Sequence, residues 1–160
     1  MLSIARNIRE AFFSLPWLIT LGVFAACILA IRPWGNYPLN DDWQYARAVK
    51  LFVESGTLRI DTPVAPALVG QVLLAYPVVR YLGMNHAVLR ALTWVITALC
   101  LLCVDRLLHL AGVLPSRRLF ALLVLMLNPL FFYFANTFMT EMYGYFPALL
   151  AAVVYFEYRR

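Results

Sequence analysis

The sequence predicts an all-α integral membrane protein, and three observations lead to that class. Hydrophobic residues make up 64% of the 160 residues and charged residues only 13%, while the mean hydropathy is +0.79. Soluble globular chains are about half apolar and about a quarter charged, so this composition excludes both a water-soluble monomer and intrinsic disorder. The apolar residues also gather in long runs, as membrane helices require. We therefore expect one membrane domain over residues 1–160.

The predicted membrane-spanning helices cover about residues 11–31, 86–109, 119–136 and 141–158. The first run is bracketed by Glu10 and Arg32 and carries no charge between them. As a helix it covers about 30 Å, which matches the hydrocarbon core. The last two runs form one stretch that would measure about 57 Å as a single helix, so it must fold back on itself. Asn136–Thr137 is the expected turn, and Asn128–Pro129 and Pro147 should kink the two helices.

The run 86–109 has charged residues at both ends. Arg90 lies near its start and Asp105–Arg106 near its end, where long side chains can extend to the lipid headgroups. Cys100 and Cys103 form a C-x-x-C pattern inside this run, but leucines flank them, so we interpret both as helix-packing residues. The basic residues sit at the edges of apolar runs, as topology anchors do. They do not indicate a nucleic-acid partner.

The segment between the first two runs leaves the topology open. Thr62–Val79 is uncharged, but it contains Pro63, Pro66, Gly70, Gln71 and Pro77, a poor set for a helix that faces lipid. If about residues 63–82 form a juxtamembrane helix, the chain has four spans, and Glu141 shares a side with the loop before it. If the segment crosses, there are five spans, and the two lie on opposite faces. Counting basic residues alone favours five spans with the N-terminus outside.

Residues 32–85 lie between the first run and the run 86–109, and the family resemblance described below makes them the first extracytoplasmic loop. They carry a pair of acids. Asn40 is the expected N-cap of an amphipathic helix over about residues 40–55, with Asp41 and Asp42 in its first turn. Gly56 is the expected terminator. The apolar spacing indicates a helix that lies against the membrane surface, and an i,i+4 ion pair would support it. The residues that show this pattern are Tyr45, Ala46, Val49, Phe52 and Val53, and the pair is Lys50 with Glu54.

The acids allow two interpretations. Asp41 and Asp42 can simply cap the helix, or they can take a proton from a hydroxyl or hold a cation at the membrane interface. Glu141, at the mouth of the last run, raises the same question, and the functional interpretation needs the four-span topology to bring the acids together. Arg59 could meet a lipid phosphate, although a solvated flank is the simpler interpretation.

The order of motifs resembles a known family. The quoted segments are N-D-D-W-Q-Y, then A-R-A-V-K-L-F-V-E-S-G-T-L-R-I, G-Q-V-L-L-A-Y-P, D-R-L-L and L-N-P-L-F-F-Y-F-A-N-T-F-M-T-E-M. Together they resemble the N-terminal part of membrane glycosyltransferases of the GT-C fold. This group includes protein O-mannosyltransferases, lipid A aminoarabinose transferases and dolichyl-phosphate-mannose-protein mannosyltransferase-like proteins. The resemblance covers nearly the whole chain.

The resemblance implies transfer of a sugar from a polyprenyl-phosphate sugar to a hydroxyl of a glycan, lipid or protein acceptor. It makes Asp41 the catalytic base, Asp42 its partner and Tyr45 a nearby wall. Glu141 matches a second acid that is commonly aspartate in the family, and we assign Arg59 to substrate binding. We assign no metal ligands, although a divalent metal would suit the leaving phosphate.

The resemblance also implies a place in the cell. It puts the chain in the plasma membrane (the inner membrane of a bacterium), with the N-terminus cytoplasmic and the acid loop extracytoplasmic. Relatives have further spans that build much of the donor pocket, so we expect this chain to be an N-terminal portion that is inactive alone. The alternative is a non-catalytic membrane protein or accessory subunit that binds lipid or a partner enzyme.

Overall fold

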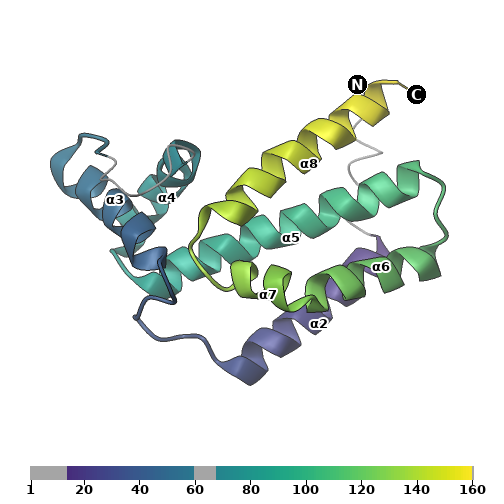
Figure 1. The fold of residues 1–160 in the computed structure, drawn as a ribbon, viewed down its shortest axis with the longest axis horizontal. Helices are drawn as coiled ribbons and strands as arrows, with labels where there is room; N and C mark the ends of the chain where they lie inside the picture. The colour runs from purple at the N-terminus through teal and green to yellow at the C-terminus, as the bar shows by residue number, and fades with distance from the viewer. Residues whose placement is uncertain (1–13, 60–67, 160) are drawn as a thin grey trace.

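The computed structural model describes residues 14–59 and 68–159, and within these ranges every regular element is a helix (Figure 1). This agrees with the predicted all-α class. In chain order the elements are α2 (Leu15–Ile31), α3 (Asp42–Ser55), α4 (Leu68–Leu82), α5 (His86–Leu110), α6 (Pro115–Leu127), α7 (Pro129–Ala135) and α8 (Thr140–Tyr158).

The long helix α5 lies at the centre of the fold and packs against α2, α6 and α8. The chain alternates in direction along this bundle. Arg118 at the start of α6 and Ser14 before α2 both lie at the C-terminal end of α5, and Glu157 near the end of α8 lies there too. The loop after α2 and the turn after α7 both lie at the opposite end, where α5 begins. The bundle is therefore up-and-down, and the start of α2 and the end of α8 lie at the same end of it (Figure 1).

The core of the bundle is apolar and aromatic because each helix presents one side to α5. Residues from all five bundle helices contribute, with Cys100 fully buried among them, which agrees with its predicted packing role. The buried members are Trp17, Phe24, Ile28, Ile96, Cys100, Leu101, Leu102, Leu122, Met126, Ala135 and Met142.

Most predicted helix positions agree with the structure. Helix α5 matches the run 86–109 closely, and α8 matches 141–158. Helix α2 begins at Leu15, while residues 11–13 of the first predicted run lie outside the described residues. The same is true of residues 63–67, which precede α4 in the predicted juxtamembrane helix.

The third predicted run differs from a single helix over 119–136. Helix α6 starts earlier, at Pro115, and the chain bends by 71° between α6 and α7. The bend lies at Asn128–Pro129, as predicted, because proline has no N–H to continue the ladder. The Asn128 side chain then accepts hydrogen bonds from the backbone amides of Leu130 and Phe131, at 3.0 and 3.3 Å. Asn128 is therefore both the residue that follows the end of α6 and the N-cap of α7.

Helices α3 and α4 form a separate layer beside the start of α5 (Figure 1). The predicted apolar face of α3 is correct in register, since Ala46 and Val49 are buried and Tyr45, Phe52 and Val53 are partly buried. Its partner was predicted wrongly, because this face packs on α4 and Phe138 rather than on the membrane surface. The layer leaves and rejoins the bundle at one end: the amide of His86 donates to the Asn36 side chain at 3.0 Å.

Helix α5 is the one helix in the described part of the chain that is long and apolar enough to cross a membrane by itself. The bent pair of α6 and α7 would make a second span if both cross as one, and α2 and α4 are shorter apolar helices. The four-span count therefore remains a prediction.

Charged side chains at the C-terminal end of α5 are paired inside the protein. Arg118 holds both carboxylate oxygens of Asp105, at 2.8 and 2.6 Å, and also donates to Ser14 at 2.8 Å. Arg106 pairs with Glu157 through one carboxylate oxygen, Oε1. We predicted that Asp105 and Arg106 extend to the headgroups, and this is wrong: Asp105 is 1% exposed and Arg106 9%. A charge buried in apolar surroundings needs such a partner.

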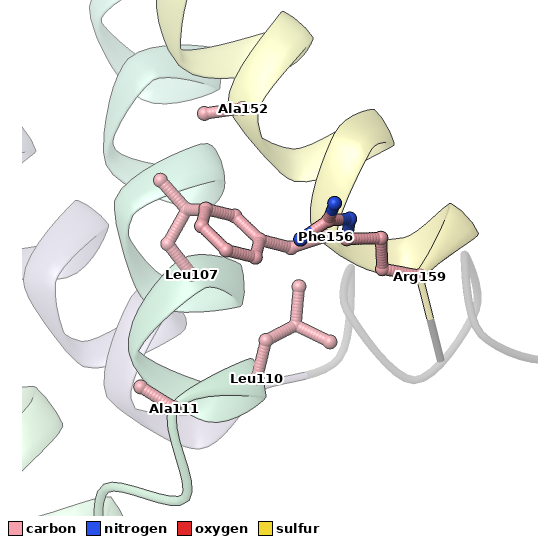
Figure 2. A pocket seen from close by; sticks show the side chains of 6 residues that line it. All are labelled: Leu107, Leu110, Ala111, Ala152, Phe156 and Arg159. Carbon is pink, nitrogen blue, oxygen red and sulfur yellow. The ribbon is translucent and has the colours of Figure 1, made fainter.

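A groove of about 520 Å³ runs between α5 and α8 near this same end (Figure 2). Its walls are apolar, with Leu107, Leu110 and Phe156 facing one another, and Arg159 stands at its edge over the ring of Tyr155. None of the described residues that line the groove is an acid, so they do not supply the carboxylate that the predicted proton transfer needs.

We expect the buried pair of Asp105 and Arg118 to hold the start of α6 on α5. Arg118→Met should lower the free energy of unfolding by about 3 kcal/mol, because it leaves the Asp105 carboxylate buried without a partner. The double variant Asp105→Leu with Arg118→Met should recover most of that loss. Denaturant titration in detergent micelles measures both values.

The matched control for this pair is Arg117→Met, which removes an exposed charge one residue away. It should change the free energy of unfolding by less than about 0.5 kcal/mol. Equal losses in Arg117→Met and Arg118→Met would contradict a specific role for the buried pair.

Candidate functional site

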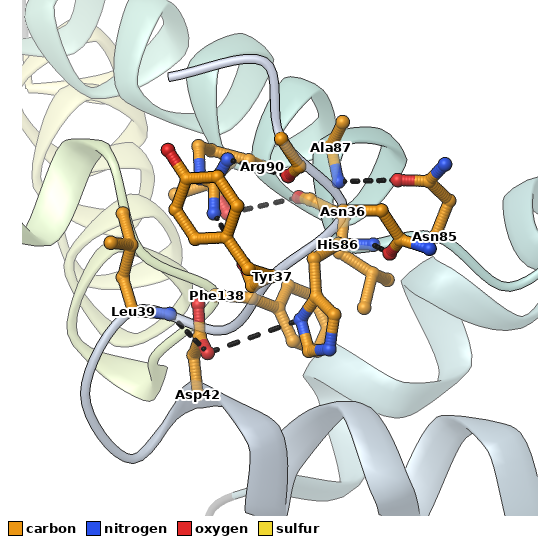
Figure 3. Close-up of polar contacts among 12 residues, drawn as sticks. Asn36, Tyr37, Leu39, Asp42, Asn85, His86, Ala87, Arg90 and Phe138 are labelled. Carbon is orange, nitrogen blue, oxygen red and sulfur yellow. Dashed lines mark hydrogen bonds and ion pairs between the residues drawn. The ribbon is translucent and has the colours of Figure 1, made fainter.

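The candidate site lies where the loop after α2, the start of α5 and the turn before α8 meet (Figure 3). Its centre is the guanidinium of Arg90, which lies one turn into α5 and is 1% exposed. It donates to the carbonyl oxygens of Pro33 and Tyr37 in the loop, the latter at 3.0 Å, and to that of Asn136 in the turn, also at 3.0 Å. One side chain thus joins three segments that are far apart in the sequence.

Our prediction that Arg90 extends to the lipid headgroups is wrong, and the structure gives the reason. Pro33 and Pro38 keep the loop out of helix and strand, so its carbonyl oxygens have no regular backbone partners. Arg90 supplies those partners, and its cation also lies over the ring of Tyr37 at 5.5 Å. Trp94, one turn further along α5, donates to the Asn136 side chain at 3.1 Å. The loop and the turn are therefore fixed to the same helix.

Asp42 is buried at the start of α3, with 1% of its surface exposed. Its Oδ1 accepts the backbone amide of Leu39 at 2.9 Å and lies 3.9 Å from Nδ1 of His86. Burial raises the pKa of Asp42 above 3.8, while His86, the backbone amides of Leu39 and Phe138, and Arg90 act in the opposite direction. Asp42 is therefore a buried carboxyl at a helix start with basic groups on one side.

The rest of the helix start differs from the prediction in one residue. Asp41, not Asn40, occupies the N-cap position, and its side chain makes no capping hydrogen bond. Asn40 instead adopts a positive φ of 55°, a conformation that asparagine tolerates. The predicted end of the helix is confirmed, because Gly56 has a φ of 67° and its amide bonds back to Phe52.

The other predicted site residues of this loop lie in different environments. Asp41 is exposed, so its carboxylate is open to a substrate, whereas Tyr45 is half-buried against the α3–α4 core. Arg59 is exposed after the end of α3. Asp41 and Asp42 are thus neighbours in sequence but not equivalent, since only Asp41 faces solvent.

Glu141 lies in the first turn of α8, after the predicted turn at Asn136–Thr137. It is half-buried, and its Oε2 is enclosed without a hydrogen-bond partner among the described residues. The residue three before it is Phe138, whose backbone amide faces Asp42. The structure therefore brings the acid loop and the segment that carries Glu141 to one place.

The described residues contain no group of three or more His, Cys, Asp or Glu side chains that could hold a metal ion. The arrangement around Asp42 and Glu141 therefore gives no support to the divalent metal suggested by the resemblance, and residues 60–67 lie outside this comparison. The described side chains at the site are carboxylates, one imidazole and one amide, which can transfer protons and form hydrogen bonds.

Three residues of this site were missed at the level of sequence. Arg90 was expected to extend to the lipid headgroups, Gln71 was counted only against a lipid-facing helix, and His86 was given no role. In the structure Gln71 is 1% exposed and its Nε2 donates to the carbonyl of Phe138 at 3.2 Å. The sequence did contain a signal, namely a polar residue inside an otherwise apolar segment. Burying such a residue costs free energy unless its side chain finds a hydrogen-bond partner.

Comparison with known proteins gives no match: no family model, no curated protein and no solved structure matches this chain.

We expect Asp42 to make the protein less stable as the pH rises. Because burial raises its pKa in the folded state, the folded protein holds this proton more tightly than the unfolded chain, so stability falls as the pH rises from 3.8 through the raised value. Asp42→Asn keeps an oxygen for the Leu39 amide and removes the titration. Melting temperatures in detergent at pH 4 and pH 7 should show the variant gaining on the wild type at the higher pH.

The opposite trend would contradict this expectation. If Asp42→Asn lost stability relative to the wild type between pH 4 and pH 7, attraction by His86 and Arg90 would outweigh the cost of burial.

Proposed function

We propose that this chain is the acid-bearing part of a membrane glycosyltransferase that uses a polyprenyl-phosphate sugar and works at the extracytoplasmic face. The observation that carries the proposal is the convergence of Asp42 with the segment that leads to Glu141. A purely capping role for the two acids would not require their segments to meet. The amide of Phe138 faces the Asp42 carboxylate, and Arg90 binds both the loop and the turn.

The proposed topology has four crossings, made by α2, α5, the α6–α7 pair and α8. Its support is the alternating direction of these helices and the return of the α3–α4 layer to the end of α5 from which it left. Buried charged groups lie near both ends of α5, with Arg90 and Asp105 about 22 Å apart along the helix. Charged groups at this spacing would lie near the two edges of a hydrocarbon core that is about 30 Å thick. Asp41 and Glu141 then share the extracytoplasmic side.

In the proposed reaction, Asp41 acts as general base because its carboxylate is exposed while that of Asp42 is buried. Asp41 takes the proton of the acceptor hydroxyl, and the acceptor oxygen attacks the anomeric carbon of the donor sugar. The bond from that carbon to the phosphate oxygen breaks, and the polyprenyl phosphate leaves with the electron pair of that bond. Attack from the face opposite the phosphate inverts the anomeric centre. Arg59, exposed after α3, is the proposed partner of the phosphate.

Asp42 has a supporting part in this proposal. Its bond to the Leu39 amide fixes the turn before α3 and so places Asp41 at the surface. Glu141 is a second carboxylate near the acceptor or the sugar, and Tyr45 is a wall of the site.

A second candidate is a non-catalytic membrane protein or accessory subunit that binds lipid or a partner enzyme. One observation favours it: Asp42 is engaged in a structural hydrogen bond, as a simple capping acid would be. The two functions differ in what they require of Asp41, which makes that residue decisive.

The topology can be tested with single cysteines in a protein whose Cys27, Cys100 and Cys103 are replaced by alanine. Asp41→Cys should react with a membrane-impermeant thiol reagent added outside intact cells, because its position is exposed at the proposed outer end. Arg117→Cys, exposed at the other end, should react only after the membrane is permeabilised. Labelling of both from the same side would contradict the four crossings.

The catalytic role can be tested with Asp41→Asn in membranes from cells that express the complete gene. Transfer of labelled sugar from polyprenyl-phosphate mannose and polyprenyl-phosphate aminoarabinose, supplied separately, should fall by about 10²–10⁴-fold, the usual loss of a general base. Membrane insertion and melting temperature should stay unchanged. Glu54→Gln, an exposed acid on the same helix, is the matched control and should retain transfer. Unchanged transfer in Asp41→Asn would favour the accessory protein.

A further inference from the structure

The groove between α5 and α8 lies at the end of the bundle opposite the acids (Figure 2). Its volume of about 520 Å³ falls within the range of about 300–1,000 Å³ that is usual for ligand pockets. Phe156 extends from α8 toward Leu107 and Leu110 of α5. Ala111 and Ala152 also line the groove, and their small side chains leave the space between the two helices unfilled.

The apolar wall on the α8 side of the groove is open to the surroundings. Phe156 keeps 52% of its surface exposed although it lines this space. Covering an exposed aromatic ring with another apolar group gains free energy, and exposed apolar patches mark sites that meet a ligand, a partner or a membrane. The opposite wall belongs to α5, which is long and apolar enough to cross a membrane. Acyl chains are therefore the apolar groups that this groove would meet.

The charged side chain at the edge of the groove is a cation. Arg159 follows the last residue of α8, and its guanidinium lies over the ring of Tyr155 at 5.0 Å. Within the described part of the chain no acid forms an ion pair with Arg159, whereas Glu157, two residues before it, pairs with Arg106. Stacking on a ring occupies the face of a guanidinium and leaves its N–H groups in the plane available. A phosphate group matches these donors, because guanidinium and phosphate form paired hydrogen bonds.

The size of the groove favours an acyl chain over a partner helix. A helix with its side chains measures about 10–12 Å across and rises about 5.4 Å per turn, so a space of about 520 Å³ would hold only about one turn of it. Specific protein interfaces bury far more surface than one helical turn supplies. An acyl chain is thin and flexible, so it can lie along the groove and contact both walls.

We propose that this groove binds an anionic phospholipid, with one acyl chain between α5 and α8 and the headgroup phosphate on Arg159. The proposal rests on the membrane location alone and holds for either function above, because the acids lie at the other end of α5. In the four-span topology this end is cytoplasmic, and the cytoplasmic leaflet carries anionic lipids. The exposed, unpaired charges at this end of the described chain, on Arg117 and Arg159, are both positive.

Native mass spectrometry of the full chain in detergent micelles measures the binding of single lipids. The probes are dioleoylphosphatidylglycerol, which is anionic, and dioleoylphosphatidylcholine, which has the same acyl chains and no net charge. The wild type should bind the anionic lipid about fivefold more tightly, the usual gain from one arginine near an anionic headgroup. Arg159→Gln should remove this preference and leave the affinity for phosphatidylcholine unchanged. Arg117→Gln, which removes an exposed cation at the same end, is the matched control and should keep the preference.

The acyl part of the site can be tested by filling the groove. Ala152→Phe places a ring in it from α8 and should weaken the binding of both lipids about tenfold. Ala111→Leu fills it from the α5 side with the same expected pattern, so the test remains decisive if Ala152→Phe fails to fold. Ala151→Phe adds the same ring at an exposed neighbouring position of α8 and should leave both affinities unchanged. Melting temperatures report folding separately from binding.

Four results would overturn the site. Unchanged lipid affinity in both filled variants would show that the acyl chain does not lie in the groove, and equal affinity of the wild type for the two lipids would remove the phosphate from Arg159. Equal losses in Arg117→Gln and Arg159→Gln would indicate a general attraction to the basic end. A dimer that Ala152→Phe dissociates would make a second copy of the chain the occupant. The transfer assay with Asp41→Asn is independent of all four, so failure of this site and failure of the proposed function are distinguishable.

Discussion

The burial of one guanidinium organises the end of the bundle that carries the acids. An arginine side chain stays charged in a protein, so Arg90 must find acceptors when α5 packs. The acceptors nearest to it are carbonyl oxygens of an irregular loop and of a turn between two helices. The same hydrogen bonds therefore satisfy both the carbonyl oxygens and the guanidinium of Arg90. The position of Asp42 beside Phe138 follows from this exchange.

The two ends of α5 differ in how their acidic side chains are paired. At the C-terminal end the buried Asp105 and the half-buried Glu157 each pair with an arginine, and these ion pairs, with Ser14, link α2, α6 and α8 to α5. At the other end Arg90 donates its hydrogen bonds to backbone oxygens, and among the described residues no arginine forms a salt bridge with Asp42 or Glu141. Polar groups whose pairing is incomplete are typical of sites that meet a ligand.

The sequence predicts the helices well because apolar runs and proline act locally. The break at Asn128–Pro129 and the end of α3 at Gly56 need no knowledge of the rest of the chain. The positions of Arg90 and Gln71 could not be predicted in this way, because their partners lie 46 to 67 residues away in sequence. For the same reason the apolar face of α3 was placed on the membrane, since its true cover is α4. For the acid site, the sequence named Asp41, Asp42 and Glu141, but not the residues that join them.

The bend between α6 and α7 makes the bundle uneven in height. Helix α6 has 13 residues and rises about 20 Å, whereas α5 has 25 residues and rises about 38 Å. In a bilayer, lipids beside α6 would meet a shorter apolar wall than lipids beside α5, and such hydrophobic mismatch is relieved by thinning or tilting. The same bend leads through α7 to the turn that holds Phe138. A thinned leaflet along this side would lower the headgroups toward the acid site, and under the proposed function this would shorten the path of the lipid-borne sugar donor.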